Sequence, residues 1–180
     1  MKTIPYMGSK RKLLPFLKDS MLDYLGDTEI HSFFDAFAGS GRVAHHFRNR
    51  YKIVANDRQS YTKVILEAYL QNTQNIQLYE YLIDGLNALP DSYHSLTDGW
   101  YTDTYGAPEN NGSSIGADGN PKPWVDYNAR KIDCIRHQID EMYPSDCVEK
   151  SVLLLSLMLA VSRISNWMGH QTGYFKDWKK

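Results

Sequence analysis

The sequence has little cysteine: Cys134 and Cys147 are its two cysteines in 180 residues, and they do not form a Cys-x-x-Cys pair. This spacing excludes a disulfide framework and the common zinc-ribbon pattern. A chain of this length buries enough apolar surface to fold without such cross-links. We therefore expect a reduced, cytoplasmic protein whose cysteines are small, buried hydrophobic residues.

Long apolar runs are also missing. The most apolar stretch, residues 152–161, is interrupted by Ser156. It is about half as long as the roughly 20 residues that a membrane-spanning helix requires. Residues 1–5 lack the apolar core of a secretory signal peptide. We therefore predict a protein without a membrane partner.

Neither sign of charge is in excess, since 20 Lys and Arg residues oppose 21 Asp and Glu residues for a net charge of −1. This balance excludes a uniformly basic, histone-like nucleic-acid binder. The distribution is uneven, however: residues 1–63 hold 11 basic and 6 acidic side chains, residues 64–127 hold 1 and 9, and residues 128–180 hold 8 and 6. The basic first third is therefore suited to a polyanionic partner.

The spacing of apolar residues in the first half predicts alternating helices and strands. An amphipathic helix is expected over residues 10–24, with Pro15 in its first turns, where the missing N–H costs little. The aromatic run at 32–37 and the segment 51–55 are typical of buried strands. Further helices are expected over residues 42–49, 61–70 and 76–86. This order predicts the first half of a doubly wound α/β sheet.

The second half of the chain changes character. Residues 99–120 are rich in Gly, Asn, Ser and Asp, a composition that predicts a long loop. Helices are expected over 129–142 and 148–164, and the second of these should be buried because it is apolar nearly all round. We divide the chain into three parts: an α/β part at 1–98, an aromatic loop at 99–127 that could read a target, and a helical part at 128–180.

Two groups of side chains in this pattern have more than one interpretation. Trp100, Tyr101 and Tyr105 stand at the front of the loop, where they either stack on nucleic-acid bases or anchor the loop. His45 and His46 are adjacent and have no Cys or carboxylate at ligand spacing, so we predict no metal site.

Three segments together predict a nucleoside-binding site. Glycines Gly39 and Gly41 follow the first strand, where they let the backbone turn sharply, and the next helix offers free N–H groups to a ligand. Asp57, sixteen positions after Gly41, ends the second strand, where a carboxylate can accept both hydroxyls of a ribose. Lys10 offers a positive charge to a ligand carboxylate. The combination fits a nucleoside with a charged amino-acid tail.

Two commoner nucleotide motifs fit less well. After Gly39-Ser40-Gly41, position 44 carries Ala in place of the third Gly of the dinucleotide fingerprint. Gly8-Ser9-Lys10 lacks the upstream glycine and the Lys-Ser/Thr order of a Walker loop. A nicotinamide or other nucleotide enzyme on the same fold is the weaker alternative.

Five stretches in order, running almost end to end, match one known family. They are Tyr6-Met7-Gly8-Ser9-Lys10-Arg11-Lys12-Leu13, then Phe34-Asp35-Ala36-Phe37-Ala38-Gly39-Ser40-Gly41, Asn56-Asp57 with Tyr61, residues 127–136, and Ser165-Asn166 with Gly169-His170 and Tyr174. In this order they resemble Dam-type, adenine-specific DNA methyltransferases that use S-adenosylmethionine. The resemblance implies a Rossmann-like methyltransferase fold with a helical C-terminal segment. It also implies double-stranded DNA as partner, methylation of the exocyclic amine of adenine, and a place in restriction-modification.

The resemblance also implies roles for individual residues. Tyr6 and Lys10 would contact the methionine part of the cofactor S-adenosyl-L-methionine, and Asp57 would hold its ribose. The expected cofactor-binding residues are Tyr6, Gly8, Ser9, Lys10, Asp35, Phe37, Ala38, Gly39, Ser40, Gly41, Asn56 and Asp57. Taken alone, Asp35 suits a loop-capping role as well as a ligand contact, and the basic run 10–12 suits a solvated helix start as well as contact with cofactor or DNA.

One feature of that family is missing. Its Asp/Asn-Pro-Pro-Tyr motif holds the exocyclic amine of an adenine flipped out of the helix, and this sequence contains no Pro-Pro. The nearest imitation, Asn120-Pro121-Lys122-Pro123-Trp124, has an extra residue and follows a Gly-rich loop rather than an apolar strand. We therefore assign no catalytic residue and expect that catalysis needs a second polypeptide or a further C-terminal part. The alternative is an inactive remnant, or a regulatory module that binds S-adenosylmethionine and DNA.

Overall fold

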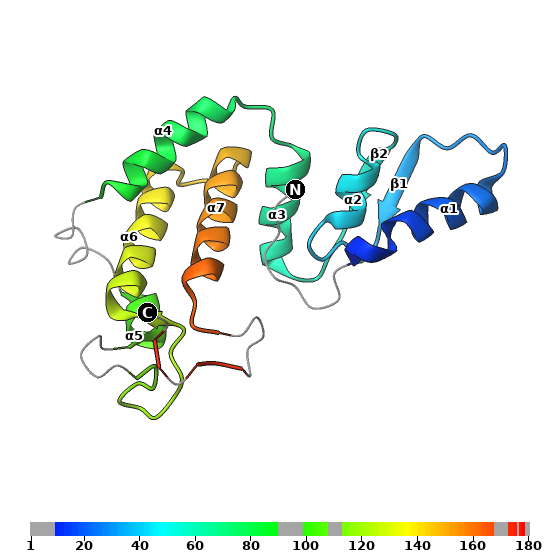
Figure 1. The fold of residues 1–180 in the computed structure, drawn as a ribbon. Coiled ribbons are helices and arrows are strands. Elements are labelled where there is room, and N and C mark those ends of the chain that lie inside the picture. The colour runs from blue at the N-terminus through cyan, green and yellow to red at the C-terminus, as the bar shows by residue number, and fades with distance from the viewer. Residues whose placement is uncertain (1–9, 90–98, 108–112, 168–172, 176, 179–180) are drawn as a thin grey trace. The chain divides into compact units, whose positions relative to one another are not determined.

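A computed structural model describes residues 10–89, 99–107, 113–167, 173–175 and 177–178 of the chain (Figure 1). It forms two compact units, Met1–Thr73 and Gln74–Lys180. Both belong to the mixed α/β class, and the described strands form two short parallel sheets of two strands each. Among the described residues, no helix has the length and apolarity to cross a membrane.

The first unit follows the order of elements that the sequence predicts. Its six elements are η1 (Lys10–Leu13), α1 (Leu14–Leu25), β1 (Ser32–Asp35), α2 (Arg42–Phe47), β2 (Lys52–Ala55) and α3 (Ser60–Leu70). The first predicted helix begins as a single 3-10 turn, and Pro15 occupies the first turn of α1 as expected. Strands β1 and β2 pair in parallel, with Phe33 opposite Ile53 and Phe34 opposite Val54.

Strand alternation gives this small sheet two different faces. Phe33 and Ile53 pack against a core formed by Val43, Phe47 and Tyr51, and so do apolar residues of α1. Phe34 and Val54 lie on the opposite face, where they are 62% and 51% exposed. The packed face is therefore the one on which α1 and α2 place their apolar residues.

The second unit is mainly helical. Its elements are α4 (Ile76–Asn87), α5 (Trp100–Tyr105), β3 (Gly106–Ala107), β4 (Trp124–Val125), α6 (Asp126–Met142) and α7 (Val148–Ile164). Helices α4, α6 and α7 share a core of Tyr79, Leu86, Ile139 and Leu153. The prediction of a loop is wrong for its aromatic start, which forms the short helix α5. Helix α7 is less buried than predicted, since several of its apolar residues are half-buried.

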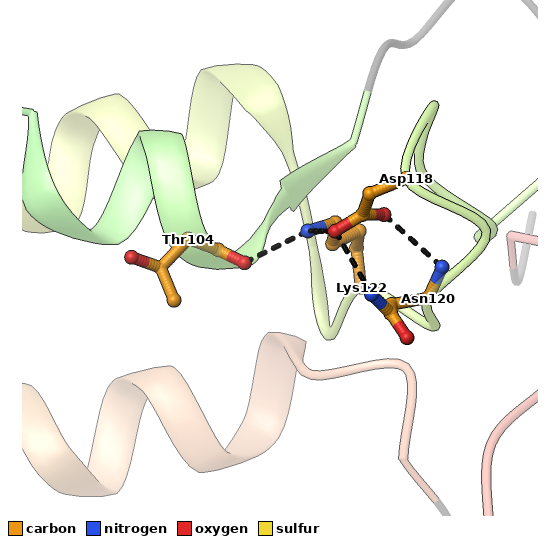
Figure 2. A network of polar contacts seen from close by, with 4 residues as sticks. All are labelled: Thr104, Asp118, Asn120 and Lys122. Atoms are coloured by element: carbon orange, nitrogen blue, oxygen red, sulfur yellow. Dashed lines mark hydrogen bonds and ion pairs between the residues drawn. The ribbon is translucent and has the colours of Figure 1, made fainter.

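A buried lysine holds the turn at residues 118–122 (Figure 2). Lys122 is only 7% exposed, and its Nζ donates to the Thr104 carbonyl at 2.9 Å and to the Asp118 carboxylate at 2.8 Å. Asn120 donates to the same carboxylate from its main chain and its side chain. Hydrogen bonds from Lys122 and Asn120 hold the pKa of Asp118 far below its usual value. These hydrogen bonds fix the Asn120-Pro121-Lys122-Pro123 segment against the rest of the second unit.

Candidate functional site

The turn after β1 is the centre of the candidate site. Gly39 and Gly41 have φ angles of +51° and +70°, a region that L side chains rarely adopt. A Cβ at Gly41 would also lie 3.0 Å from the Leu66 side chain of α3. The sequence therefore needs glycine here both for the bend and for the close approach of α3.

Asp57 links this turn to the end of β2. One carboxylate oxygen accepts from the Gly39 N–H at 2.8 Å, and the other accepts from the Gln59 N–H at 3.0 Å. The main-chain hydrogen bonds from Gln59 and Gly39, in that order, lower the pKa of Asp57. The carboxylate is therefore ionised at neutral pH and fixed in orientation. A carboxylate has about four acceptor sites, and the main-chain donors Gly39, Gln59 and Arg58 do not fill all of them.

Asn56 closes the other side of the turn. Its carbonyl accepts from the Ala38 N–H at 2.9 Å, and its side-chain amide donates to the Ala36 carbonyl at 3.1 Å. Its own N–H donates to the Asp35 carbonyl at 2.8 Å. Asn56 thus extends the β1–β2 ladder into the turn, a main-chain role that the residue pattern did not reveal.

Asp35 has a structural role, one of the two interpretations that the sequence left open. Its side chain is 8% exposed and accepts from the Ala44 N–H at 3.2 Å. Ala44 lies in the first turn of α2, where Gly41 provides no side-chain cap. The Asp35 carboxylate therefore caps the N-terminus of α2, although Asp35 precedes the helix in sequence. A negative group at a helix N-terminus is stabilising. Whether it also touches a ligand stays a prediction.

Lys10 reaches the same turn from η1. Its Nζ donates to the Phe37 carbonyl at 3.3 Å, and the Phe37 side chain is 80% exposed. The charge of Lys10 also contributes to the lowered pKa of Asp57. Of the predicted site residues, the fold thus brings together Lys10, the turn 35–41, Asn56 and Asp57. Tyr6, Gly8 and Ser9 lie outside the described residues.

The sequence matches the D12 class N6 adenine-specific DNA methyltransferase family over residues 6–180. The chain belongs to this family. The resemblance to adenine-specific methyltransferases is therefore confirmed. No solved structure matches the chain.

Three curated relatives illustrate the family. The modification methylase LlaI of Lactococcus lactis subsp. lactis is 29% identical over 97% of this chain and 27% of its own length. The type II methyltransferase M.NlaIII of Neisseria lactamica is 27% identical over 97% of this chain and 50% of its own length. The type II methyltransferase M.CviAII of Paramecium bursaria Chlorella virus 1 is 29% identical over 100% of this chain and 52% of its own length. The chain spans between about a quarter and half of the length of these family members.

Two other groups singled out in the sequence have packing partners. Among the described residues, no cluster of His, Cys, Asp and Glu could hold a metal ion. His45 packs edge-on against Tyr69 at 5.9 Å, and burial, followed by the charge of Arg48, lowers its pKa. The loop aromatics Trp100, Tyr101 and Tyr105 pack on one another, and the last two also pack on Trp124. Loop anchoring is therefore at least part of their role.

Proposed function

We propose that this chain is the S-adenosylmethionine-binding part of a DNA adenine methyltransferase. The supporting observation is the convergence of Lys10, Gly39 and Asp57 at the ends of β1 and β2. In open α/β sheets this end of the strands is where ligands bind. The proposal assigns the chain a partial Rossmann-like methyltransferase fold, with the β1–β2 pair as its centre.

The described residues fit a nucleoside with an amino-acid tail. The Asp57 carboxylate keeps acceptor capacity for a ribose hydroxyl, and the exposed Phe37 ring offers an apolar surface in the same turn as Gly39. The Lys10 ammonium can turn from the Phe37 carbonyl to a ligand carboxylate, because a 3.3 Å hydrogen bond is a weak restraint. When bound, S-adenosylmethionine supplies an electrophilic methyl group. The protein then contributes mainly position and orientation.

The acceptor side of the reaction needs groups that this sequence does not hold. An adenine amine has its lone pair delocalised into the ring, so a carboxylate or amide and a backbone carbonyl must polarise it. The family motif that does so contains Pro-Pro, which this chain lacks. We infer that a second polypeptide or a further C-terminal part provides it. Residues 99–127 would then contact double-stranded DNA as a target-recognition insertion, in a cytoplasmic restriction-modification system.

Calorimetry and a methylation assay test this proposal together. The chain should bind S-adenosylmethionine more tightly than NADH, because the third glycine of the dinucleotide fingerprint is absent. Tritiated methyl transfer to mixed-sequence duplex DNA should appear only when a polypeptide with the Asp/Asn-Pro-Pro-Tyr motif is added. Binding without methylation in every combination would favour an inactive remnant or a regulatory module. Tighter binding of NADH would overturn the assignment of the cofactor.

A further inference from the structure

The turn between α2 and β2 concentrates positive charge. Residues 42–63 hold six Lys and Arg side chains and one carboxylate, that of Asp57. This carboxylate accepts main-chain hydrogen bonds at the glycine turn and at the start of α3. Three of the six cations are exposed within five positions, and we call them the basic turn: Arg48, Arg50 and Lys52.

The cations of the basic turn have no carboxylate partner. No ion pair in the described part of the chain includes any of the three. Arg48 Nη1 donates to the His45 carbonyl in α2 at 3.2 Å, and the Arg50 guanidinium lies 5.7 Å from the centre of the Tyr51 ring. Two of the cations are therefore held by their neighbours, and their charges remain available to an anion.

The basic turn is separate from the candidate cofactor site. Strands β1 and β2 run parallel with Ser32 opposite Lys52, so Lys52 stands where both strands begin. The glycine turn follows β1, and Asp57 follows β2, where the strands end. A strand of four residues spans about 13 Å. The positive charge of the basic turn therefore lies at the other end of the small sheet.

The surface of the basic turn is polar throughout. The two large aromatic residues beside the cations, Phe47 and Tyr51, are only 4% and 8% exposed. The centre of a protein–protein interface is depleted of charged residues and rich in apolar and aromatic ones. Arg and Lys side chains without an apolar centre are instead typical of contacts to nucleic-acid phosphates. The chemistry of the turn therefore fits a phosphodiester backbone better than a folded protein.

We propose that the basic turn binds the phosphate backbone of duplex DNA, independently of base sequence. Each cation displaces a counterion from the duplex, and this release drives the association. The contact adds affinity without reading bases, because phosphates carry no direct sequence information. The choice of DNA as the polyanion rests on the proposed function, whereas the charge and exposure of the turn do not.

Fluorescence anisotropy with a labelled duplex tests the basic turn on the full chain. The probe is a fluorescein-labelled DNA duplex of mixed sequence, titrated without cofactor between about 50 and 200 mM salt. Arg50→Ala and Lys52→Ala should each lower the slope of log Kd against log salt concentration by about one, and the double variant by about two. Arg50→Lys keeps the charge and should keep the slope. Lys18→Ala removes an exposed cation from α1 and is the matched control with an unchanged slope.

The sequence dependence and the competitor decide what the turn recognises. Two duplexes of unrelated sequence should lose the same factor of affinity in the double variant, and circular dichroism checks that each variant is folded. The proposal is overturned if the wild-type chain binds no duplex, if the double variant keeps the wild-type slope, or if Lys18→Ala lowers the slope equally. It is also overturned if polyglutamate binds the turn more tightly than the duplex, since an acidic protein would then be the partner.

Calorimetry with S-adenosylmethionine separates this inference from the proposed function. The double variant should bind the cofactor as the wild type does, because the basic turn lies one strand length from the glycine turn. Cofactor binding with a slope that the double variant leaves unchanged would overturn the inference alone. A lowered slope in a chain that binds no S-adenosylmethionine would overturn the proposed function alone.

Discussion

Removing the carboxylate of Asp57 tests the architecture of the site most directly. The side chain accepts main-chain hydrogen bonds at 2.8 and 3.0 Å from Gly39 and Gln59. Because the acceptor is charged but only partly buried, we expect Asp57→Ala to lower the free energy of unfolding by about 1–3 kcal/mol. In a domain of this size, each kcal/mol lowers Tm by about 2–4 °C.

The same substitution should weaken cofactor binding. Loss of the ribose contact is expected to cost about 1–3 kcal/mol of binding free energy, which corresponds to roughly 5- to 150-fold in Kd. Asp57→Asn keeps one oxygen acceptor and should therefore lose less stability and less cofactor affinity than Asp57→Ala. Asp23→Ala removes an exposed carboxylate from α1 and serves as the matched control. Urea unfolding and calorimetry with S-adenosylmethionine measure the two effects.

The lowered pKa of Asp57 also predicts how its contribution to stability changes with pH. The folded-state pKa of Asp57 is lowered, so below its unfolded pKa of about 3.9 the unfolded chain binds more protons than the folded chain. The Asp57 contribution is therefore fully present above pH ~4 and declines as the pH falls through the folded-state pKa. The stability difference between the wild type and Asp57→Ala should shrink over that range. Equal stability and affinity at neutral pH, or an equal loss in Asp23→Ala, would refute the reasoning.

Three further predictions concern stability, each measured by urea unfolding. Gly41→Ala should cost about 1–2 kcal/mol because of its left-handed backbone, and no loss would mean that the turn can rearrange. Asp133→Ala should cost about 1–3 kcal/mol, since the buried Asp133 carboxylate accepts three hydrogen bonds at the start of α5; an unchanged midpoint would contradict that role. Lys122→Met should reduce the acid-dependent loss of stability below pH ~4 that the lowered pKa of Asp118 predicts, and the Asn120 hydrogen bonds should retain the remainder. An unaltered pH profile in Lys122→Met would show that Lys122 does not lower the pKa of Asp118.

Local patterns in the sequence were sufficient to predict the elements of the first unit and the residue types at its glycine turn. Strand alternation, a proline in the first helical turn and glycines after a strand are short-range properties, because each depends on residues within a few positions. The family likewise follows from the order of its motifs. The predicted site residues that lie in the described part of the chain come together at the ends of β1 and β2.

The roles of single side chains depended on tertiary contacts. Asp35 caps a helix that begins after the turn, and Lys122 is buried against a carbonyl eighteen residues away. Neither contact produces a periodic pattern in the sequence, because each depends on how whole elements pack together. A cavity beside β2 has the same origin: Ile53 and Ala55 of the strand and Leu66 and Leu70 of α3 line it only when the two elements pack together. Sequence alone therefore determined which family the chain belongs to, and the fold decided which polar atoms at the glycine turn are already hydrogen-bonded.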